Sequence, residues 1–331
     1  MHSIEFAAPT RKEDVAHLAG QSWNDAEILA GGTDLLALMK NEVVTPKRVV
    51  NIKGIADLKG VKNVPDALVI GALTPLQDVA DNATVMRQYP ALAEAANDAA
   101  SPQIRNMATL GGNLCQRPRC WWFRNGFGLL AMQEGKSLVP DGDNRYHAIL
   151  GNEGPAYFVS PSTIAPVLIA YNAMVSILGP SGERHVQLEK FYVTPKSEND
   201  REHDLKPGEV VTAITIPGKR PPGTLRAASY EVRQKHAFDW PLAMASVALT
   251  MNGNTVNTAR VVLGHVAPTP WISQEAAEVL QGKPLTADQA TAAGAAAVRA
   301  AQPLSHNGYK VQLTRVAVKR AIMKAAGLKE S

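Results

Sequence analysis

Ile28-Leu29-Ala30-Gly31-Gly32-Thr33-Asp34-Leu35-Leu36 is the stretch that decides the fold. Its apolar start, double glycine, hydroxyl and acid, followed by apolar residues at helical spacing, predict a strand, a tight turn and a helix start. Glycines permit positive φ, and unpaired N–H groups at a helix start suit an anion such as phosphate. The stretch also fits an ordinary turn with Thr33 or Asp34 as the helix N-cap.

A second double glycine lies about 80 positions further along, in Thr109-Leu110-Gly111-Gly112-Asn113. It also follows a hydroxyl residue, and no internal repeat links the two sites. A single glycine turn is common, but two turns that each carry a threonine and a carboxylate or amide could grip the two ends of a pyrophosphate. The pair therefore favours a phosphate-containing ligand.

The composition sets broad limits on the fold and on the partners. With 331 residues, of which 45% are apolar, the chain can form two or three units with a sizeable core. The formal net charge is only +4, with both signs spread throughout, which argues against nucleic-acid binding. Basic residues near the C-terminus predict the solvated face of an amphipathic last helix: Lys310, Arg315, Lys319, Arg320, Lys324 and Lys329.

The N-terminus and the cysteines bear on the compartment. Residues 1–6 lack the basic-then-apolar pattern of a signal peptide, and no apolar run reaches the roughly 18 residues of a membrane span. We therefore expect a soluble chain with no export signal of its own and no membrane insertion. Cys115 and Cys120 are too few for a disulfide framework. A cytoplasmic location fits, as does a periplasmic one reached by co-export with a partner subunit.

Residues 1–54 predict one small α+β unit. Short strands and helices alternate in it, which indicates three parallel strands with helices packed on them. The expected elements are strands at 3–6, 27–30 and 48–51 and helices at 11–19 and 35–41.

Residues 55–218 predict a second α+β unit with an inserted loop at 115–155. We expect β-structure over 57–72, a helix started by Thr74 and Pro75, and an alanine-rich helix over 89–100. The loop is irregular and rich in glycine, arginine and aromatic residues, and a loop of this length is usually functional. After it we expect a strand at 156–159, a helix at 164–171 opened by Ser162 or Thr163, and strands at 173–178 and 210–216.

Pro217-Gly218-Lys219-Arg220-Pro221-Pro222-Gly223 is the best linker candidate, and it places a third unit at 224–331. Strands are expected at 227–233, 242–251 and 255–264, with a hairpin turn at Asn252-Gly253-Asn254. The remainder is helical, with breaks at 282–284 and 305–308. The third unit is thus predicted to be a three-stranded antiparallel sheet followed by a bundle of about three helices.

The sequence carries no motif for catalysis by side chains alone. The Gly-x-Gly-x-x-Gly fingerprint, the Walker A motif, His-Glu-x-x-His and paired Cys-x-x-Cys are absent, and the eight histidines are too scattered for metal-ligand spacing. Cys115 and Cys120 could ligate a cluster or form a redox disulfide, but a [4Fe–4S] cluster needs about four thiolates, which favours two ordinary thiols. Anion-gripping turns without an acid, base or metal favour a cofactor that carries the chemistry.

These segments together resemble the FAD-binding medium subunit of the xanthine dehydrogenase, CO dehydrogenase and aldehyde oxidoreductase family of molybdenum hydroxylases. The resemblance rests on both glycine motifs in the right order and spans nearly the whole chain. Further matching landmarks are Gly71-Ala72-Leu73-Thr74, Leu205–Glu209, Ile214–Pro217 and Tyr230–Arg233. The resemblance implies an α+β fold, in which a two-subdomain FAD-binding part of the PCMH type precedes a C-terminal sheet and helix bundle that pack toward partner subunits.

The resemblance also implies which residues bind FAD. In the family, the two glycine turns hold the FAD pyrophosphate between two N-terminal α+β subdomains, and a third segment lies near the cofactor. Carried over to this sequence, the cofactor-binding residues are Ala30, Gly31, Gly32, Thr33, Asp34 and Leu35 in the first turn, Thr109, Gly111, Gly112 and Asn113 in the second, and Ala72 and Thr74 in the third segment. No catalytic side chain and no metal ligand is expected on this chain.

This sequence departs from the family at two places. Thr163 stands where the family has an Asp in a Ser-Asp turn. The 115–155 loop resembles that of the periplasmic aldehyde oxidoreductase type, which carries a [4Fe–4S] cluster, but Cys120 alone persists and Ala156 occupies the place of another thiol. We therefore predict that the loop is kept without a cluster, with three aromatic residues packed in its stead: Trp121, Trp122 and Phe123.

The implied function is electron transfer within a heteromeric complex. A molybdenum-cofactor large subunit would oxidise or hydroxylate the substrate, a [2Fe–2S] small subunit would pass electrons to FAD on this chain, and an external acceptor would take them. The isolated chain is not expected to oxidise the substrate. Two alternatives stay open: a stand-alone flavin oxidase or reductase of the wider fold, which includes UDP-N-acetylmuramate dehydrogenase, and a structural subunit that has lost FAD.

Overall fold

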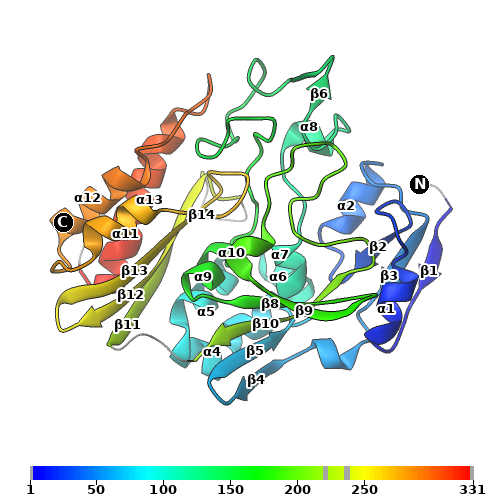
Figure 1. The fold of residues 1–331 in the computed structure, drawn as a ribbon, viewed down its shortest axis with the longest axis horizontal. Coiled ribbons are helices and arrows are strands. Elements are labelled where there is room, and N and C mark those ends of the chain that lie inside the picture. The colour runs from blue at the N-terminus through cyan, green and yellow to red at the C-terminus, as the bar shows by residue number, and fades with distance from the viewer. Residues whose placement is uncertain (1–2, 219–222, 235–238, 329–331) are drawn as a thin grey trace.

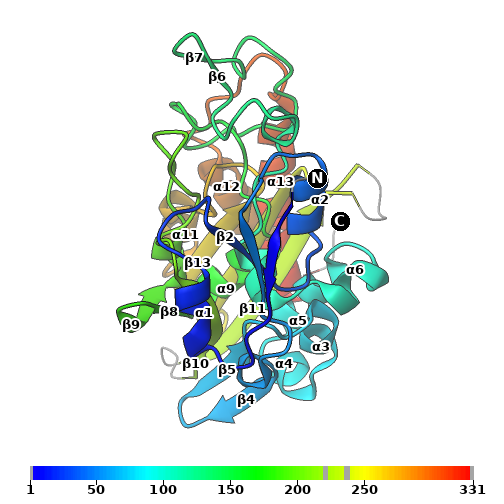
Figure 2. The same cartoon turned by 90° about the vertical axis from the view of Figure 1, so that its right-hand side faces the viewer.

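The computed structural model describes residues 3–218, 223–234 and 239–328. Three larger sheets follow one another across the molecule, with the N-terminal sheet on one side, a five-stranded sheet in the middle and the C-terminal sheet with its helices on the other side (Figure 1). The loop that carries α8 (Trp121–Arg124) and β6 (Met132–Gln133) projects away from the middle sheet between these outer parts (Figures 1 and 2). The α+β class predicted from the sequence is confirmed.

The N-terminal sheet forms as predicted. Strand β3 (Arg48–Asn51) pairs in parallel with β1 (Glu5–Ala7) and with β2 (Ala26–Leu29), so the strand order is β1-β3-β2. Helices α1 (Glu13–Leu18) and α2 (Leu35–Lys40) form the crossovers that parallel strands require. The strand, turn and helix around the first double glycine are therefore confirmed.

The middle sheet is antiparallel and has the order β4-β5-β10-β8-β9. Its strands are β4 (Val61–Val64), β5 (Ala67–Gly71), β8 (Met174–Gly179), β9 (Gly182–Gln187) and β10 (Val210–Pro217), and the short 3-10 helix η1 (Ala56–Leu58) precedes β4. The central strand β10 is mostly buried, as its apolar run predicts. Strand β9 was not predicted, because an edge strand needs little apolar pattern and this one is largely polar and exposed.

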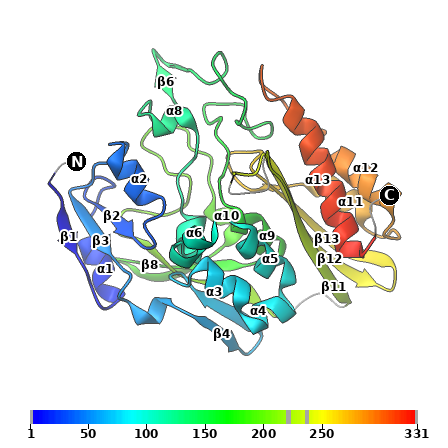
Figure 3. The same ribbon diagram turned by 180° about the vertical axis from the view of Figure 1, so that it is seen from behind.

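Short helices cover the middle sheet. From behind, α3, α4, α5 and α6 lie over its face (Figure 3). Pro90 and Pro102 each begin a helix, in line with the preference of proline for the first turn. The helices are α3 (Leu76–Asp81), α4 (Ala83–Gln88), α5 (Pro90–Asp98), α6 (Pro102–Met107), α7 (Leu110–Leu114), α9 (Ile164–Ala170) and α10 (Leu188–Phe191).

Helix α9 joins two layers of the molecule. All seven of its residues are buried, because it packs between helices α5, α7 and α10 of the middle unit and two strands of the C-terminal sheet, β12 (Ala243–Asn252) and β13 (Thr255–Gly264). Thr163 occupies the N-cap position without a side-chain bond, whereas the Ser162 hydroxyl accepts the N–H of Ala165. Of the two predicted openers of this helix, Ser162 makes the stabilising contact.

The strand predicted at 156–159 is wrong. Ala156 and Phe158 are buried, but the segment belongs to no sheet. Its backbone bonds to two loops instead, since the Ala148 N–H donates to the Tyr157 carbonyl and the Ser160 N–H to the Ala267 carbonyl. An apolar run indicates that a segment is buried but does not indicate what buries it. Here the segment is buried by loops and not by a neighbouring strand.

The inserted loop is largely irregular, as predicted. It contains one turn of helix, α8 (Trp121–Arg124), and a two-stranded ribbon of β6 (Met132–Gln133) and β7 (Lys136–Ser137). Near its end, the amide of Asn144 bonds to Ser305 and that of Asn152 to the carbonyl of Gln302. The loop is therefore anchored on the C-terminal unit.

The C-terminal unit is an antiparallel sheet covered by helices. Strands β11 (Thr224–Val232), β12 (Ala243–Asn252) and β13 (Thr255–Gly264) form the predicted sheet, and a two-residue strand β14 (Trp271–Ile272) extends it. Helices α11 (Gln274–Leu280), α12 (Ala287–Ala297) and α13 (Tyr309–Ala326) confirm the three-helix bundle. The central part of the predicted linker, residues 219–222, lies outside the described residues. Within the described part of the chain, no helix is both long and apolar enough to cross a membrane.

The expectation that the basic residues of the last helix all face solvent is wrong at Lys310. This side chain is buried, and its ammonium group donates to the carbonyls of Tyr146, His147 and His265 at 3.3, 3.0 and 2.7 Å. A buried ammonium needs such acceptors because its desolvation is costly. Lys310 therefore ties the inserted loop to the start of α13, which helical spacing alone cannot reveal.

Three buried histidines should make the fold sensitive to acid. Burial lowers the pKa of His147 and His203 to about 4 and that of His265 to about 3. Histidine in an unfolded chain titrates near ~6.5. Between these values the unfolded chain binds protons that the folded chain does not, so the free energy of unfolding should fall as the pH drops from about 7 to about 4.5.

His203 offers a direct test of this acid sensitivity, because its ring stacks on Phe191 with centroids 5.3 Å apart. His203→Asn should reduce the pH slope of the unfolding free energy by up to about 1.4 kcal/mol per pH unit near pH ~5.5. Denaturant titrations at several pH values measure the slope. His17→Asn, on the exposed face of α1, is the control. Equal slopes in the wild type and in His203→Asn would refute the assignment.

Candidate functional site

The two glycine turns pack directly against neighbouring backbone. A Cβ on Gly31 would lie 2.0 Å from the carbonyl oxygen of Met107, and a Cβ on Gly111 would lie 2.8 Å from the Cβ of Ala72. Both distances are far below van der Waals contact. Gly31 thus allows the end of β2 to touch the segment before α7, and the two turns predicted to face each other do lie together.

The first turn presents unused backbone donors. Among the described residues, no protein acceptor bonds to the N–H groups of Gly31, Gly32, Thr33, Asp34 and Leu35. Gly32 has a φ of +79°, a conformation that disfavours a side chain. Consecutive free N–H groups around such a turn form a concavity that binds anions. An anionic group is therefore the ligand that this turn can satisfy.

The second turn differs, because its donors are already engaged. The Gly111 N–H bonds to the Ala72 carbonyl at 2.8 Å, the Gly112 N–H to the Thr109 hydroxyl at 3.1 Å, and the Asn113 N–H to the Thr109 carbonyl at 2.8 Å. Thr109 thus acts as the N-cap of α7. The second turn contributes a rigid wall here, while the first turn contributes the open amides.

A cavity of about 190 Å³ opens on one side of these turns, and we call it the first lobe. Apolar side chains such as Ile28, Leu38 and Leu73 form part of its wall. Most of the predicted cofactor-binding residues line it: Ala30, Gly31, Gly32, Thr33, Asp34, Leu35, Ala72, Thr109, Gly111 and Gly112. The structure therefore brings together residues that lie far apart in sequence.

A larger cavity of about 500 Å³, the second lobe, lies on the other side of the turns. It shares four lining residues with the first lobe, namely Thr33, Asp34, Gly112 and Gln116. Its other walls include Ile104, Thr163, Arg233 and Trp240. The glycine turns thus stand at the boundary of a two-lobed cleft, which suits an elongated ligand whose charged group lies near its middle.

Two predicted residues take other positions. Thr74 is buried, and its hydroxyl accepts the N–H of Gly60 at 2.9 Å, so it supports the turn after η1. Asn113 lines the second lobe and not the first, and its amide oxygen accepts a hydrogen bond from the Ser162 hydroxyl at 2.7 Å. Thr163, which stands at the position of the family Asp, lies buried in the wall of the same lobe.

The sequence analysis missed several residues that shape the cleft. Arg117 and Arg201 line the first lobe, and the Arg201 guanidinium lies 4.4 Å from the centre of the Trp23 ring. In the second lobe, Arg119 lies 4.5 Å from the centre of the Trp240 ring. Arg117 and Arg119 follow the second turn within a few residues, and this proximity was the available signal. Arg201 carries no comparable signal, because only folding brings it near.

The ionisable groups around the cleft are held in defined states. Burial raises the pKa of the Cys115 thiol to about 12 and lowers that of His203 to about 4, so both are neutral near pH ~7. Burial also lowers the pKa of Arg119 to about 10, which still leaves it charged. The first lobe is therefore lined by the neutral groups of Cys115 and His203 and by arginines and carboxylates that form ion pairs, and neither neutral group is ready for acid–base chemistry near pH ~7.

The cysteines of the loop region are both free. The Cys120 sulfur lies 3.1 Å from Nε2 of His147. Within the described residues, no group of three or more His, Cys, Asp or Glu side chains is placed to hold a metal ion. The aromatic residues after Cys120 pack locally, with Trp121 edge-on to Tyr146 and Trp122 edge-on to Phe127.

Comparisons with known proteins agree over the whole chain. A family model described as the FAD binding domain in molybdopterin dehydrogenase matches residues 2–219, and one described as the CO dehydrogenase flavoprotein C-terminal domain matches residues 228–325. The chain is 31% identical to the aldehyde oxidoreductase FAD-binding subunit PaoB of Escherichia coli (strain K12), over 91% of each chain. It is 30% identical to the carbon monoxide dehydrogenase medium chain of Hydrogenophaga pseudoflava, over 96% of each.

A solved structure gives the same result for the fold. A chain of the carbon monoxide dehydrogenase from Hydrogenophaga pseudoflava that lacks the Mo-pyranopterin moiety of its cofactor superposes with a TM-score of 0.78. The sequence identity is 28%, and the match covers 98% of both chains.

Because the carbonyl of Met107 leaves no room for a side chain, Gly31→Ala should separate the first turn from the segment before α7. We expect a loss of about 1–3 kcal/mol in unfolding free energy, as for other overpacked sites. Denaturant titration of the full chain measures it. Gly54→Ala is the matched control, since nothing lies within 4 Å of a Cβ there. Equal stability of the two variants would contradict the close approach.

Proposed function

We propose that this chain, which belongs to the family of FAD-binding medium subunits of CO dehydrogenase, xanthine dehydrogenase and aldehyde oxidoreductase, passes electrons from a [2Fe–2S] subunit through FAD to an external acceptor. FAD, when bound, supplies a redox centre that can take up and release electrons. The [2Fe–2S] cluster and the molybdenum cofactor would belong to separate small and large subunits. The oxidation of the substrate would then take place outside this chain.

The single observation that carries the proposal is the row of free amides at the boundary of two lobes. FAD is an elongated molecule with a diphosphate near its middle and an aromatic group at each end. The N–H groups of residues 31–35 have no protein acceptor among the described residues, and a diphosphate would satisfy them. The lobes on either side offer apolar and aromatic walls for the two ends. The residues present thus fit the cofactor.

The chain's own residues would bind and shield the cofactor. The amides of residues 31–35 would hold the diphosphate, and Thr109, Gly111 and Gly112 would form the facing wall. Ala72 supports this wall, because its carbonyl accepts the Gly111 N–H and its side chain touches Gly111. Asn113 would act in the second lobe, with its amide oriented by Ser162.

The protonation states at the cleft support a binding role over a catalytic one. Cys115 lines the first lobe as a neutral thiol, because burial raises its pKa to about 12. His203 lines the same lobe as a neutral imidazole, because burial lowers its pKa to about 4. Neither is poised near neutral pH to transfer a proton.

We also propose the domain limits and the location that follow from this assignment. The FAD-binding subdomains would comprise residues 1–54 and 55–218, and the domain that packs toward the partners would comprise residues 224–331. The chain would act in the cytoplasm, or in the periplasm after co-export with a partner subunit.

The complex purified from its native host should contain about one FAD per copy of this chain, together with a molybdenum subunit and a [2Fe–2S] subunit. Visible absorbance, cofactor extraction and mass spectrometry measure this. Adding the substrate of the large subunit should bleach the flavin in the complex and leave the isolated chain unchanged, because under this proposal the substrate binds to the large subunit. Bleaching of the isolated chain by NADH would support a stand-alone flavin reductase instead, and a complex without flavin bands would support a structural subunit.

Iron and sulfide analysis of the purified chain tests the loop. With the expected cysteines missing, the chain should contain no [4Fe–4S] cluster. A content of about four irons per polypeptide, as in one such cluster, would contradict this. The loop would then need ligands other than cysteine.

A further inference from the structure

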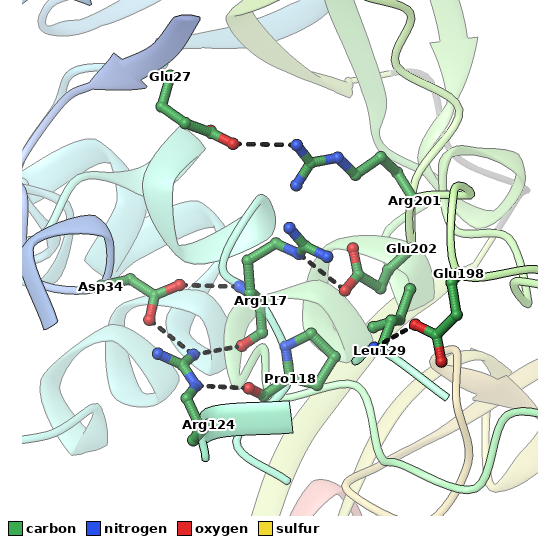
Figure 4. Close-up of polar contacts among 9 residues, drawn as sticks. All are labelled: Glu27, Asp34, Arg117, Pro118, Arg124, Leu129, Glu198, Arg201 and Glu202. Atoms are coloured by element: carbon green, nitrogen blue, oxygen red, sulfur yellow. Dashed lines mark hydrogen bonds and ion pairs between the residues drawn. The ribbon is translucent and has the colours of Figure 1, made fainter. Parts of the chain in front are cut away.

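Both carboxylate oxygens of Asp34 are engaged by other groups of the protein. Its Oδ2 accepts the Arg117 backbone N–H at 2.8 Å, and its Oδ1 lies 2.8 Å from Nη2 of Arg124 (Figure 4). The same Oδ1 lies 3.1 Å from Nη2 of Arg119. All three partners come from the segment just after the second glycine turn. Asp34 belongs to the first glycine turn, so its side chain connects that turn to the segment that follows the second glycine turn.

Arg117 and Arg124 make this segment rigid. Arg124 donates from Nη2 to the Arg117 carbonyl at 2.9 Å and from Nε to the Pro118 carbonyl at 2.7 Å (Figure 4). It therefore fixes the same backbone segment whose N–H at Arg117 is bonded to Asp34. The Arg117 Nε donates to Glu202 at 2.8 Å. Burial opposes the charge of Glu202, but the charge of Arg117, its hydrogen bond to the carboxylate and further local interactions together keep the pKa of Glu202 below its ordinary value. This buried pair is therefore charged near neutral pH.

The same contacts close a ring around the first lobe. Arg201, next to Glu202 in sequence, bonds to Glu27 of β2 at 2.9 Å, and Glu27 leads along the chain back to Asp34 (Figure 4). The members that line the lobe are Glu27, Asp34, Arg117 and Arg201. The ring joins three segments distant in sequence, so the wall of the lobe and the first turn are positioned as one unit.

Charge explains why Asp34 would not serve as a direct contact of the cofactor. A carboxylate beside amides that bind an anion would repel a diphosphate unless cations neutralised it. Arg119 and Arg124 provide this neutralisation, and the Asp34 side chain is 16% exposed in that pairing. Charge-assisted bonds of this kind are about twice as strong as neutral ones.

We infer that Asp34 is a positioning residue, which fixes the anion-binding amides of residues 31–35 by tying them to Arg117, Arg119 and Arg124. This inference rests on the proposed binding of FAD. It separates the role of the Asp34 side chain from that of its backbone N–H, and it gives the start of the inserted loop a task at the cofactor site. Within the described residues, Arg124 lines neither lobe, so it can reach the cofactor site only through its partners.

The test compares Asp34→Asn, Arg124→Gln and the double variant in the purified complex, freed of FAD and titrated with FAD by flavin fluorescence. Each single change should raise the dissociation constant of FAD about tenfold or more. The double variant should be little worse than Asp34→Asn, because both changes break one linkage. A rise in Asp34→Asn with none in Arg124→Gln would mean that Asp34 contacts FAD directly, and no rise in either would remove the positioning role.

Glu198→Gln is the matched control. Glu198 accepts the N–H of Leu129 at 2.5 Å (Figure 4) and that of Leu130 at 3.0 Å, so it also anchors the inserted loop. In the described structure it lies outside the lining of both lobes. Its dissociation constant for FAD should stay within about twofold of wild type, even where the midpoint of thermal unfolding falls. An equal loss of affinity in this control would mean that general loosening of the loop, and not Asp34, weakens binding.

Hydrogen exchange separates this inference from the proposed function. The amides of Leu36, Ala37 and Leu38 bond to the carbonyls of Gly32 and Asp34 and report the order of the first turn. In protein free of FAD, their exchange should be faster in Asp34→Asn and in Arg124→Gln and unchanged in Glu198→Gln. A wild-type complex that takes up no FAD would refute the proposed function, whereas unchanged exchange in all variants would refute the positioning role alone.

Discussion

The contact between Gly31 and the carbonyl of Met107 is the constraint on which the candidate site depends. A side chain larger than hydrogen at residue 31 would overlap that oxygen, so glycine there sets how closely the N-terminal sheet approaches the helices of the middle unit. Gly111 meets Ala72 in the same way on the other side. With both turns pressed onto backbone, the amides after β2 stay free of protein partners, and the cleft keeps its two lobes.

The close approach at Gly31 does not by itself orient the first turn. The ionic contacts of Asp34 provide that orientation. Asp34 follows the two glycines and is held from the far side by Arg117, Arg119 and Arg124. Exposed ion pairs add little to stability, but these groups are largely buried, and an unpaired buried charge is costly. The charge of Asp34 is therefore paired only when the start of the inserted loop lies against the first turn. The loop is thus part of the cofactor-binding unit as well as an appendage on the C-terminal unit.

The C-terminal unit is joined to the rest by burial and also by ion pairs, namely Lys324 with Glu94 and Arg260 with Glu189. Helix α9 has no exposed residue, because strands β12 and β13 of the C-terminal sheet and helices α5, α7 and α10 pack around it. Lys310 adds a polar anchor, since its ammonium group is satisfied by the carbonyls of Tyr146, His147 and His265. The N-terminal sheet, whose strand β2 leads into the first glycine turn, and the C-terminal helices lie at opposite sides of the molecule (Figures 1 and 3).

Sequence by itself determined the local elements and the location of the cleft, because glycine turns, proline starts and apolar periods are local signals. It predicted the parallel N-terminal sheet, the hairpin at Gly253 and the last three helices, and most of the cofactor-binding residues that it predicted do line the first lobe. Tertiary structure alone decided the rest. Strand β9 is too polar to be recognised from an apolar pattern. Residues 156–159 are buried by loops and not by a sheet. Lys310 is buried although the pattern of its helix predicts an exposed side chain. The partners of Asp34 lie 83 or more positions away, and only folding pairs such charges.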